Sequence, residues 1–348
     1  MFQNQVPQTE RIEYIDALRG FTMILVIYYH VQVISYGYND FDSFNNVFIK
    51  FRMPLFFFIS GWVLNNNKLT TALQIGEFIK KKFRVQIIST FIFLFLYLYI
   101  NQIPLNNAIF DGSKHGYWFT YTLFIYFCFY CTSKLLSFFL HHENIFILAI
   151  CIFVLIIYFY TQYDIFYSDS KPSYDKLYSL LSVSKWNYYL FFVMGIMVKK
   201  YYKQFISLTN NSYFMTFSIV TFLLLILLNS THFSAQRFLL EGPLGILIIF
   251  TYFRKNETSF THEHFIGRSF QYIGKRTLDI YLLHYFFVPK DLAILGHYFS
   301  IHNNPSIELF ISMGISLMVI CVCLITSQII RTSDFLAFLL FGAKRKIK

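Results

Sequence analysis

The sequence is short of charge. Only 14% of its 348 residues are Asp, Glu, Lys or Arg, against roughly 25% in soluble domains, whereas 56% are hydrophobic and 22% are aromatic. So few charged side chains cannot cover the surface of a water-soluble fold of this length. The composition therefore excludes a soluble domain and predicts an all-α polytopic membrane protein that contacts the lipid bilayer and no nucleic acid.

Several motifs that would indicate other chemistries are also missing. There is no G-x-S-x-G elbow, no Gly-rich phosphate loop and no H-E-x-x-H helix, and the loop sequence His262-Glu263-His264 lacks metal-site spacing. The pair Cys128-x-x-Cys131 has no second pair to complete a zinc site, and the remaining cysteines lie in apolar segments. We expect buried structural thiols, no bound metal and no bound cofactor.

The chain also lacks linkers and low-complexity runs that would mark a second domain. We expect one integral membrane domain over residues 1–348, without a separate soluble domain. The first ten residues are polar, and no small-residue cleavage site follows the first apolar run. The first helix is therefore expected to be an uncleaved membrane span.

Windows of about 20 apolar residues predict ten spans. They cover residues 17–36, 46–64, 85–101, 117–139, 145–161, 186–202, 213–230, 237–254, 270–290 and 306–330. An even count places both termini on one side, and 21 of the 29 Lys and Arg residues fall on that side. The positive-inside rule then predicts cytoplasmic termini in the cell (inner) membrane.

Three ionisable residues stand on one face of the first span. Arg19 and His30 are eleven residues apart, which is close to a whole number of helical turns, and Asp16 is at i, i+3 from Arg19. At ~1.5 Å per residue, His30 lies ~16 Å beyond Arg19, near the middle of a ~30 Å hydrocarbon layer. A near-neutral base at this depth predicts a functional site.

The second and third windows carry weaker candidates. Ser60, in the stretch PLFFFISGW, lies toward the cytoplasmic side of its span, where small residues commonly serve helix packing. The run FIKKKFR ends in Lys81, Lys82 and Arg84, which the positive-inside rule alone explains. Lys81 and Arg84 are nevertheless i, i+3 neighbours, so they could grip a phosphorylated ligand together.

A second deep histidine, His284, ends the sequence IGKRTLDIYLLH of the ninth window. It is eight residues past Arg276, so we expect it at the depth of His30, with Tyr281 in the same cavity. Glu241 is a further charge inside a span, and Arg52 or Arg237 is the expected partner.

These motifs resemble those of the acyltransferase family 3 membrane proteins, which include bacterial O-antigen and Nod-factor acetylases and other acetylases that modify exopolysaccharides. The resemblance rests on Asp16-Ala17-Leu18-Arg19-Gly20 with His30, on PLFFFISGW, on Lys81-x-x-Arg84, on FFVMGIMV at 191–198 and on IGKRTLDIYLLH at 273–284. It covers essentially the whole chain in the same order. It implies a ten-helix enzyme that transfers an acyl group, usually acetyl, from cytoplasmic acetyl-CoA to a carbohydrate or glycolipid hydroxyl on the other side.

By the same resemblance, His30 is the essential histidine, with Arg19 and Asp16 beside it in the catalytic motif. Lys81, Lys82, Arg84 and Ser60 are the donor-binding candidates, although lysine replaces the family's commoner arginine at position 81. His284, Tyr281, Glu241 and Arg52 are candidates for lining the cavity or stabilising an oxyanion. His30 acts either as a general base or as an acyl carrier. The alternative is a transporter or flippase for a lipid-linked glycan or a small anionic substrate.

Overall fold

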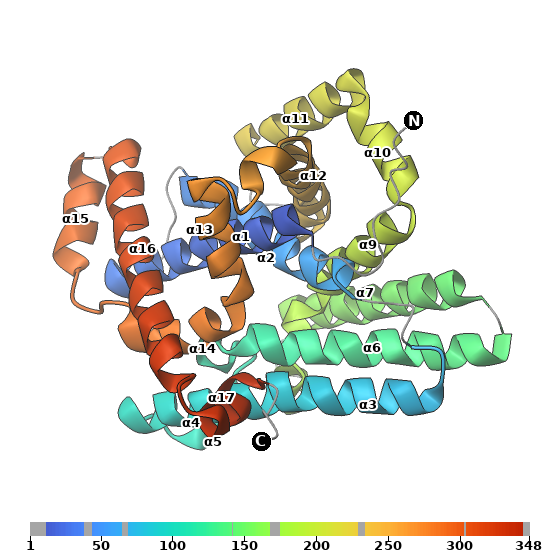
Figure 1. Cartoon of the computed structure of the whole chain (residues 1–348), viewed down its shortest axis with the longest axis horizontal. Coiled ribbons are helices and arrows are strands. Elements are labelled where there is room, and N and C mark those ends of the chain that lie inside the picture. The colour runs from blue at the N-terminus through green and yellow to red at the C-terminus, as the bar shows by residue number, and fades with distance from the viewer. Residues whose placement is uncertain are drawn as a thin grey trace. The chain divides into compact units, whose positions relative to one another are not determined.

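The structure, a computed structural model, describes residues 12–37, 44–64, 69–140, 142–167, 175–228, 234–302 and 304–343. The regular structure within these ranges is helical throughout and contains no β-strand (Figure 1). This agrees with the all-α prediction, because a chain with so much apolar sequence satisfies its backbone groups inside lipid by forming helices.

Within the described ranges, five helical stretches are long and apolar enough to cross a membrane, namely Glu13–Ser35, Ala72–Ile100, Trp118–Leu140, Glu143–Ile165 and Pro305–Ile330. The pair Tyr202–Asn210 and Ser212–Leu227, bent by 81°, adds a sixth if it is one span. The chain is thus a multi-pass membrane protein. The other expected windows also contain helices, but these helices are either shorter or interrupted by charged residues.

The helices divide into two compact units. The first unit is Met1–Trp62 with Met194–Ile325, and it contains the helices that carry His30 and His284. Its elements are α1 (Glu13–His30), the π-helix η1 (Val31–Ser35), α2 (Phe44–Trp62), α10 (Tyr202–Asn210), α11 (Ser212–Leu227), α12 (Ser234–Lys255), η7 (Glu257–Phe260), α13 (Phe265–Lys275), α14 (Thr277–Phe287) and α15 (Ala293–His302).

The second unit comprises Val63–Val193 with Thr326–Lys348. Its elements are α3 (Ala72–Lys82), the π-helix η3 (Phe83–Ile88), α4 (Ser89–Ile100), α5 (Leu105–Ile109), η4 (Lys114–Gly116), α6 (Trp118–Leu140), α7 (Glu143–Tyr167), α8 (Asp175–Leu180), η5 (Val183–Tyr188) and α17 (Asp334–Phe341). The division falls inside α9 (Tyr189–Lys200) and α16 (Pro305–Ile330).

Two glycines let α1 and α13 cross with their backbones in contact. A Cβ atom on Gly20 would lie 1.9 Å from the carbonyl oxygen of Phe270, and one on Gly274 would lie 1.8 Å from that of Asp16. No side chain fits in either place, so small residues are required there, as in other closely packed membrane helices. These glycines belong to the first and last motifs of the sequence, which the fold therefore brings together.

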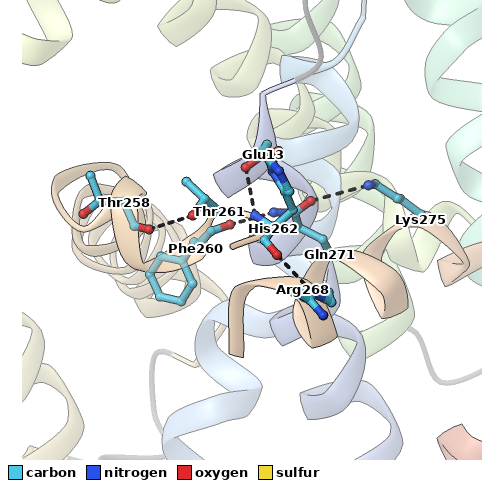
Figure 2. A network of polar contacts seen from close by, with 8 residues as sticks. All are labelled: Glu13, Thr258, Phe260, Thr261, His262, Arg268, Gln271 and Lys275. Carbon is cyan, nitrogen blue, oxygen red and sulfur yellow. Dashed lines mark hydrogen bonds and ion pairs between the residues drawn. The ribbon is translucent and has the colours of Figure 1, made fainter. Parts of the chain in front are cut away.

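A polar network fixes the segment between α12 and α13 to the start of α1 (Figure 2). Glu13 accepts a hydrogen bond from the backbone N–H of His262 at 3.1 Å, and its other oxygen lies 2.7 Å from the ring Nδ1 of His262. Arg268 donates to the carbonyl of His262, and Gln271 donates to that of Phe260. The loop histidine thus has a structural contact with the first helix.

Aromatic rings fill the core of the first unit around Phe250 of α12. Its ring centroid lies 5.2 Å from that of Phe58 and 5.0 Å from that of Trp62, both in α2. Gly195 of α9 approaches the same part of α2, where an added Cβ would lie 2.0 Å from the carbonyl of Phe58. The small residue that permits close packing on PLFFFISGW is therefore this glycine of the FFVMGIMV run.

In the second unit, α3, α6 and α7 lie side by side (Figure 1). The basic run 78–84 and the apolar window that follows it lie in one continuous helix, because α3, η3 and α4 together form Ala72–Ile100. The short apolar helix α17 packs against this helix, with the ring of Phe341 stacked on that of Phe93 at 6.0 Å.

All five cysteines are free thiols in the structure. Cys131, Cys151 and Cys323 are buried, as expected, and Cys128 is partly buried. Cys321 is exposed on α16, so the prediction of burial is wrong for this residue. It lies on an apolar helix, where exposure is compatible with a neighbouring lipid.

Candidate functional site

His30 lies where the first helix changes its winding. It is the last residue of α1, and the next five residues, Val31–Ser35, are π-helical. A π-helical turn inside an α-helix is rare overall. Where such a turn does occur, it often lies at a functional site. The apolar pattern gave no indication of this turn.

His30 and His284 lie beside each other. Their ring centroids are 4.9 Å apart, and the Nε2 atom of His30 is 3.2 Å from the hydroxyl of Tyr285. The two histidines therefore stand at one level, as predicted from their distances to Arg19 and Arg276. The tyrosine that contacts His30 is Tyr285, and the ring of the predicted Tyr281 lies 5.9 Å from His284.

The tautomer of His284 follows from its hydrogen bonds. Its Nδ1 atom lies 2.7 Å from the carbonyl oxygen of Tyr281, which can only accept, so Nδ1 carries the proton. In the neutral ring, Nε2 is then an acceptor. This fully buried atom has no hydrogen-bond partner among the residues that the structure describes. A buried lone pair without a partner is costly and is typical of functional sites.

Arg52 of α2 is buried next to this pair. Its guanidinium carbon lies 3.5 Å from the ring centroid of Tyr29, which in turn stands 5.2 Å from the ring of His30. A permanent positive charge is thus held close to the two histidines, on the face of an aromatic ring. The sequence predicted Arg52 near a cavity but gave no reason to pair it with Tyr29.

A second polar cluster occupies the other end of α1. Arg19 donates to the hydroxyl of Thr277 at 3.2 Å, and its guanidinium lies 3.9 Å from Asp16. Just before α14, Arg276 lies 3.5 Å from the buried Asp279 of that helix. Each carboxylate is buried while its arginine is about 30% exposed, so both cations reach the surface of the unit.

The contacts of Arg19 and His30 confirm that they share a face. Arg19 contacts Thr277 at the start of α14, and His30 contacts Tyr285 near its end. However, the expected single span 270–290 is wrong, because α13 ends at Lys275 and α14 begins at Thr277. The break at Arg276 allows α13 to cross α1 at its glycines while α14 runs alongside α1.

Glu241 has two cationic partners. Its carboxylate oxygens lie 3.0 Å from Arg237, as predicted, and 3.1 Å from Lys50. Arg52, the other partner predicted for Glu241, lies over the ring of Tyr29 instead. Lys50 is the second cation beside Glu241. Glu241 is almost completely buried, so this is a charge cluster inside the helices of the first unit.

Two residues past His30, Gln32 forms a further polar contact. Its amide donates to Glu308 of α16 at 2.8 Å and to the hydroxyl of Tyr28 at 2.9 Å. The sequence reasoning missed Glu308. Its only signal was an acid in the first turn of an apolar window.

The candidates for donor binding are divided between the two units. Ser60 belongs to the first unit, where its hydroxyl donates to the carbonyl of Phe56 in its own helix. In the second unit, Lys81 is exposed at the end of α3, and Lys82 lies over the ring of Phe127 at 4.1 Å. Arg84 lies in η3, with its guanidinium 4.5 Å from the ring of Phe338.

Metal ligands do not gather anywhere in the described part of the chain. No three His, Cys, Asp or Glu side chains within those ranges lie close enough together to hold an ion.

The long apolar helices make this chain a multi-pass membrane protein. Its buried charges and its histidine pair beside a tyrosine hydroxyl form a polar site inside the helices. A family profile described as an acyltransferase domain matches residues 12–326, and the chain belongs to acyltransferase family 3. It is therefore a membrane acyltransferase. The comparison with curated proteins gives no match, and the comparison with solved structures gives none either.

Proposed function

We propose that this acyltransferase moves an acetyl group from acetyl-CoA to a hydroxyl of a cell-envelope or extracellular carbohydrate. The observation that carries the proposal is the contact between the Nε2 atom of His30 and the hydroxyl of Tyr285, next to His284, in a chain of this family. Transfer to a hydroxyl requires a base of near-neutral pKa, and histidine is the side chain that provides one.

In the proposed reaction, His30 acts as the general base. The acceptor hydroxyl takes the position at Nε2 that the Tyr285 hydroxyl holds in the structure. Nε2 accepts the proton while the oxygen attacks the thioester carbonyl, so the new C–O bond forms as the C–S bond breaks. The thiolate of coenzyme A then takes this proton from His30, and free coenzyme A leaves.

The negative charge on the carbonyl oxygen needs donors. The guanidinium of Arg52, buried against Tyr29, and the hydroxyl of Tyr285 are the groups that we assign to it. The neutral His284 cannot donate from Nε2, because its proton is on Nδ1. We therefore assign His284 as a second proton acceptor beside His30, and not as an oxyanion donor.

The basic groups at the ends of the helices suit the phosphates of coenzyme A. Lys81, Lys82 and Arg84 of the second unit provide positive charge that attracts such a ligand. Of these, arginine binds phosphate through two parallel N–H groups, whereas lysine acts as a point charge.

Release of free coenzyme A tests the proposal. Purified protein in detergent is incubated with acetyl-CoA and a panel of bacterial envelope glycans, and the free thiol is measured. We expect thiol release that increases with at least one glycan. The competing function is transport of a lipid-linked glycan or small anion. Movement of such a substrate in proteoliposomes, with no thiol release under any condition, would refute the enzyme assignment.

A further inference from the structure

Two arginines of the second unit lie over successive rings of one helix. The guanidinium carbon of Arg84 is 4.5 Å from the ring centroid of Phe338, and that of Arg331 is 5.0 Å from the ring centroid of Phe341. Phe338 and Phe341 are three residues apart on α17, so they share one face of this helix. Arg84 comes from η3, and Arg331 precedes α17 by three residues.

The short helix α17 is fixed firmly enough to hold both cations in place. Its last residue, Phe341, stacks on Phe93 of α4. The next residue, Gly342, ends the helix in the left-handed conformation, with φ of 62°. A Cβ atom on Gly342 would lie 2.5 Å from the side chain of Val85 in η3, so the end of α17 sits directly on the π-helical turn.

The surroundings of the two arginines are positively charged. Residues 72–88 and 331–343 hold five cations, Lys80, Lys81, Lys82, Arg84 and Arg331, and two acids, Glu77 and Asp334. This gives a net charge of +3 on two adjoining segments. Like charges repel, so an anion that binds between them relieves this repulsion.

A ring next to the guanidinium suits both arginines to this task. The ring attracts the cation and restricts its side chain before the ligand arrives. The N–H groups of a guanidinium lie at the edges of its plane, so each arginine can offer parallel N–H groups to a phosphate.

We propose that Arg84 and Arg331, mounted on α17, form a binding site for the phosphate groups of the coenzyme A donor. Arg331 is the new member of this site, because it lies far along the chain from the basic run 78–84. The inference rests on the proposed function, since it assigns the donor to this chain. The alternative is a purely structural role, in which both arginines only hold α17 in place.

The test compares Arg331→Gln with wild type, using acetyl-CoA and acetyl-dephospho-CoA, which lacks the 3′-phosphate. A lost charge-assisted phosphate contact should raise KM for acetyl-CoA by about tenfold or more. The kcat value should remain within about twofold, because the site does not touch the reacting carbonyl. If KM rises for acetyl-CoA alone, Arg331 binds the 3′-phosphate, and if it rises for both donors, Arg331 binds the diphosphate.

Arg331→Lys and Lys203→Gln serve as controls. The lysine variant keeps the charge but loses the planar fork, so its KM should fall between those of wild type and Arg331→Gln. Lys203→Gln removes one exposed charge from α10 of the first unit and should leave KM unchanged. Thermal unfolding of each variant shows whether α17 has detached.

An unchanged KM for both donors in a folded Arg331→Gln protein would overturn the inference. Absence of thiol release by wild type would instead overturn the proposed function. In that case, direct binding of radiolabelled coenzyme A to wild type and Arg331→Gln still tests the site. Equal affinities would contradict it.

Discussion

Replacement of Gly20 by alanine should disable the site without touching it. A Cβ on Gly20 would lie 1.9 Å from the carbonyl oxygen of Phe270, whereas ordinary contact begins at 3.4 Å. The helices α1 and α13 must therefore move apart by about 1.5 Å, since the clash involves backbone that cannot rotate away. Overpacking of this kind typically costs about 1–3 kcal/mol of folding free energy.

The movement of α13 should reach the histidine pair, because α14 follows it after the single residue Arg276. If only a third of the shift passes to α14, the distance from Tyr285 to His30 exceeds the roughly 3.5 Å limit of a hydrogen bond. A misplacement of about 1 Å can cost on the order of 10² in rate. We expect thiol release from acetyl-CoA to fall by about that factor in Gly20→Ala.

Gly314→Ala is the matched control. Gly314 lies in α16 of the same structure, and nothing lies within 4 Å of the place where its Cβ would be. The change should leave activity intact and stabilise the helix by about 0.5–1 kcal/mol. If Gly20→Ala unfolds at the wild-type temperature and keeps full activity, the close crossing of α1 and α13 is not what positions the site.

Three further predictions concern other parts of the molecule. Tyr285→Phe removes the hydroxyl at His30, so kcat should fall by about 10²-fold while KM for acetyl-CoA stays within twofold; equal kcat values in a steady-state assay would exclude an oxyanion role. Glu241→Gln leaves two cations without their buried counter-charge, so chemical unfolding should show a loss of folding free energy on the order of 2 kcal/mol. This is less than the largest costs of breaking buried pairs, because Lys50 is partly exposed. No loss would mean that water already screens the cluster. Burial lowers the pKa of Lys114 to about 8 in the folded protein, so between about pH 8 and pH 10.5 the unfolded chain holds a proton on Lys114 that the folded chain has lost. The stability measured by thermal unfolding should therefore rise over this pH range. Lys114→Met should remove the rise, and an identical rise in the variant would contradict the prediction.

Helical phase predicted the central part of the site because it depends only on spacing along one helix. Arg19 and His30 are eleven residues apart, and both contact α14 in the structure. The depth of His284 followed in the same way from its distance to Arg276. These predictions needed no knowledge of how helices pack.

Contacts between helices could not be predicted in this way. Arg52 pairs with Tyr29, and Lys50 takes the place beside Glu241, because the rotation of α2 decides which cation faces which helix. Tyr285, which the sequence did not single out, contacts His30, whereas the predicted Tyr281 lies near His284.

The winding changes were equally invisible to apolar periodicity. Of the π-helical turns in the described residues, one lies directly after His30 and another contains Arg84. Periodicity of 3.6 residues treats such a turn as ordinary helix. The glycines at positions 20 and 274 were part of the motifs, but only the structure shows that they face each other.

The central claim is that His30 is the base that removes the acceptor proton. The most direct measurement is acceptor-dependent release of coenzyme A by His30→Ala, compared with His262→Ala, which makes the same substitution at an exposed loop position. Our account predicts a loss of at least about 10²-fold for His30→Ala, with normal membrane insertion and unfolding temperature, and wild-type release for His262→Ala. Full acceptor-dependent release by a folded His30→Ala protein would contradict the claim.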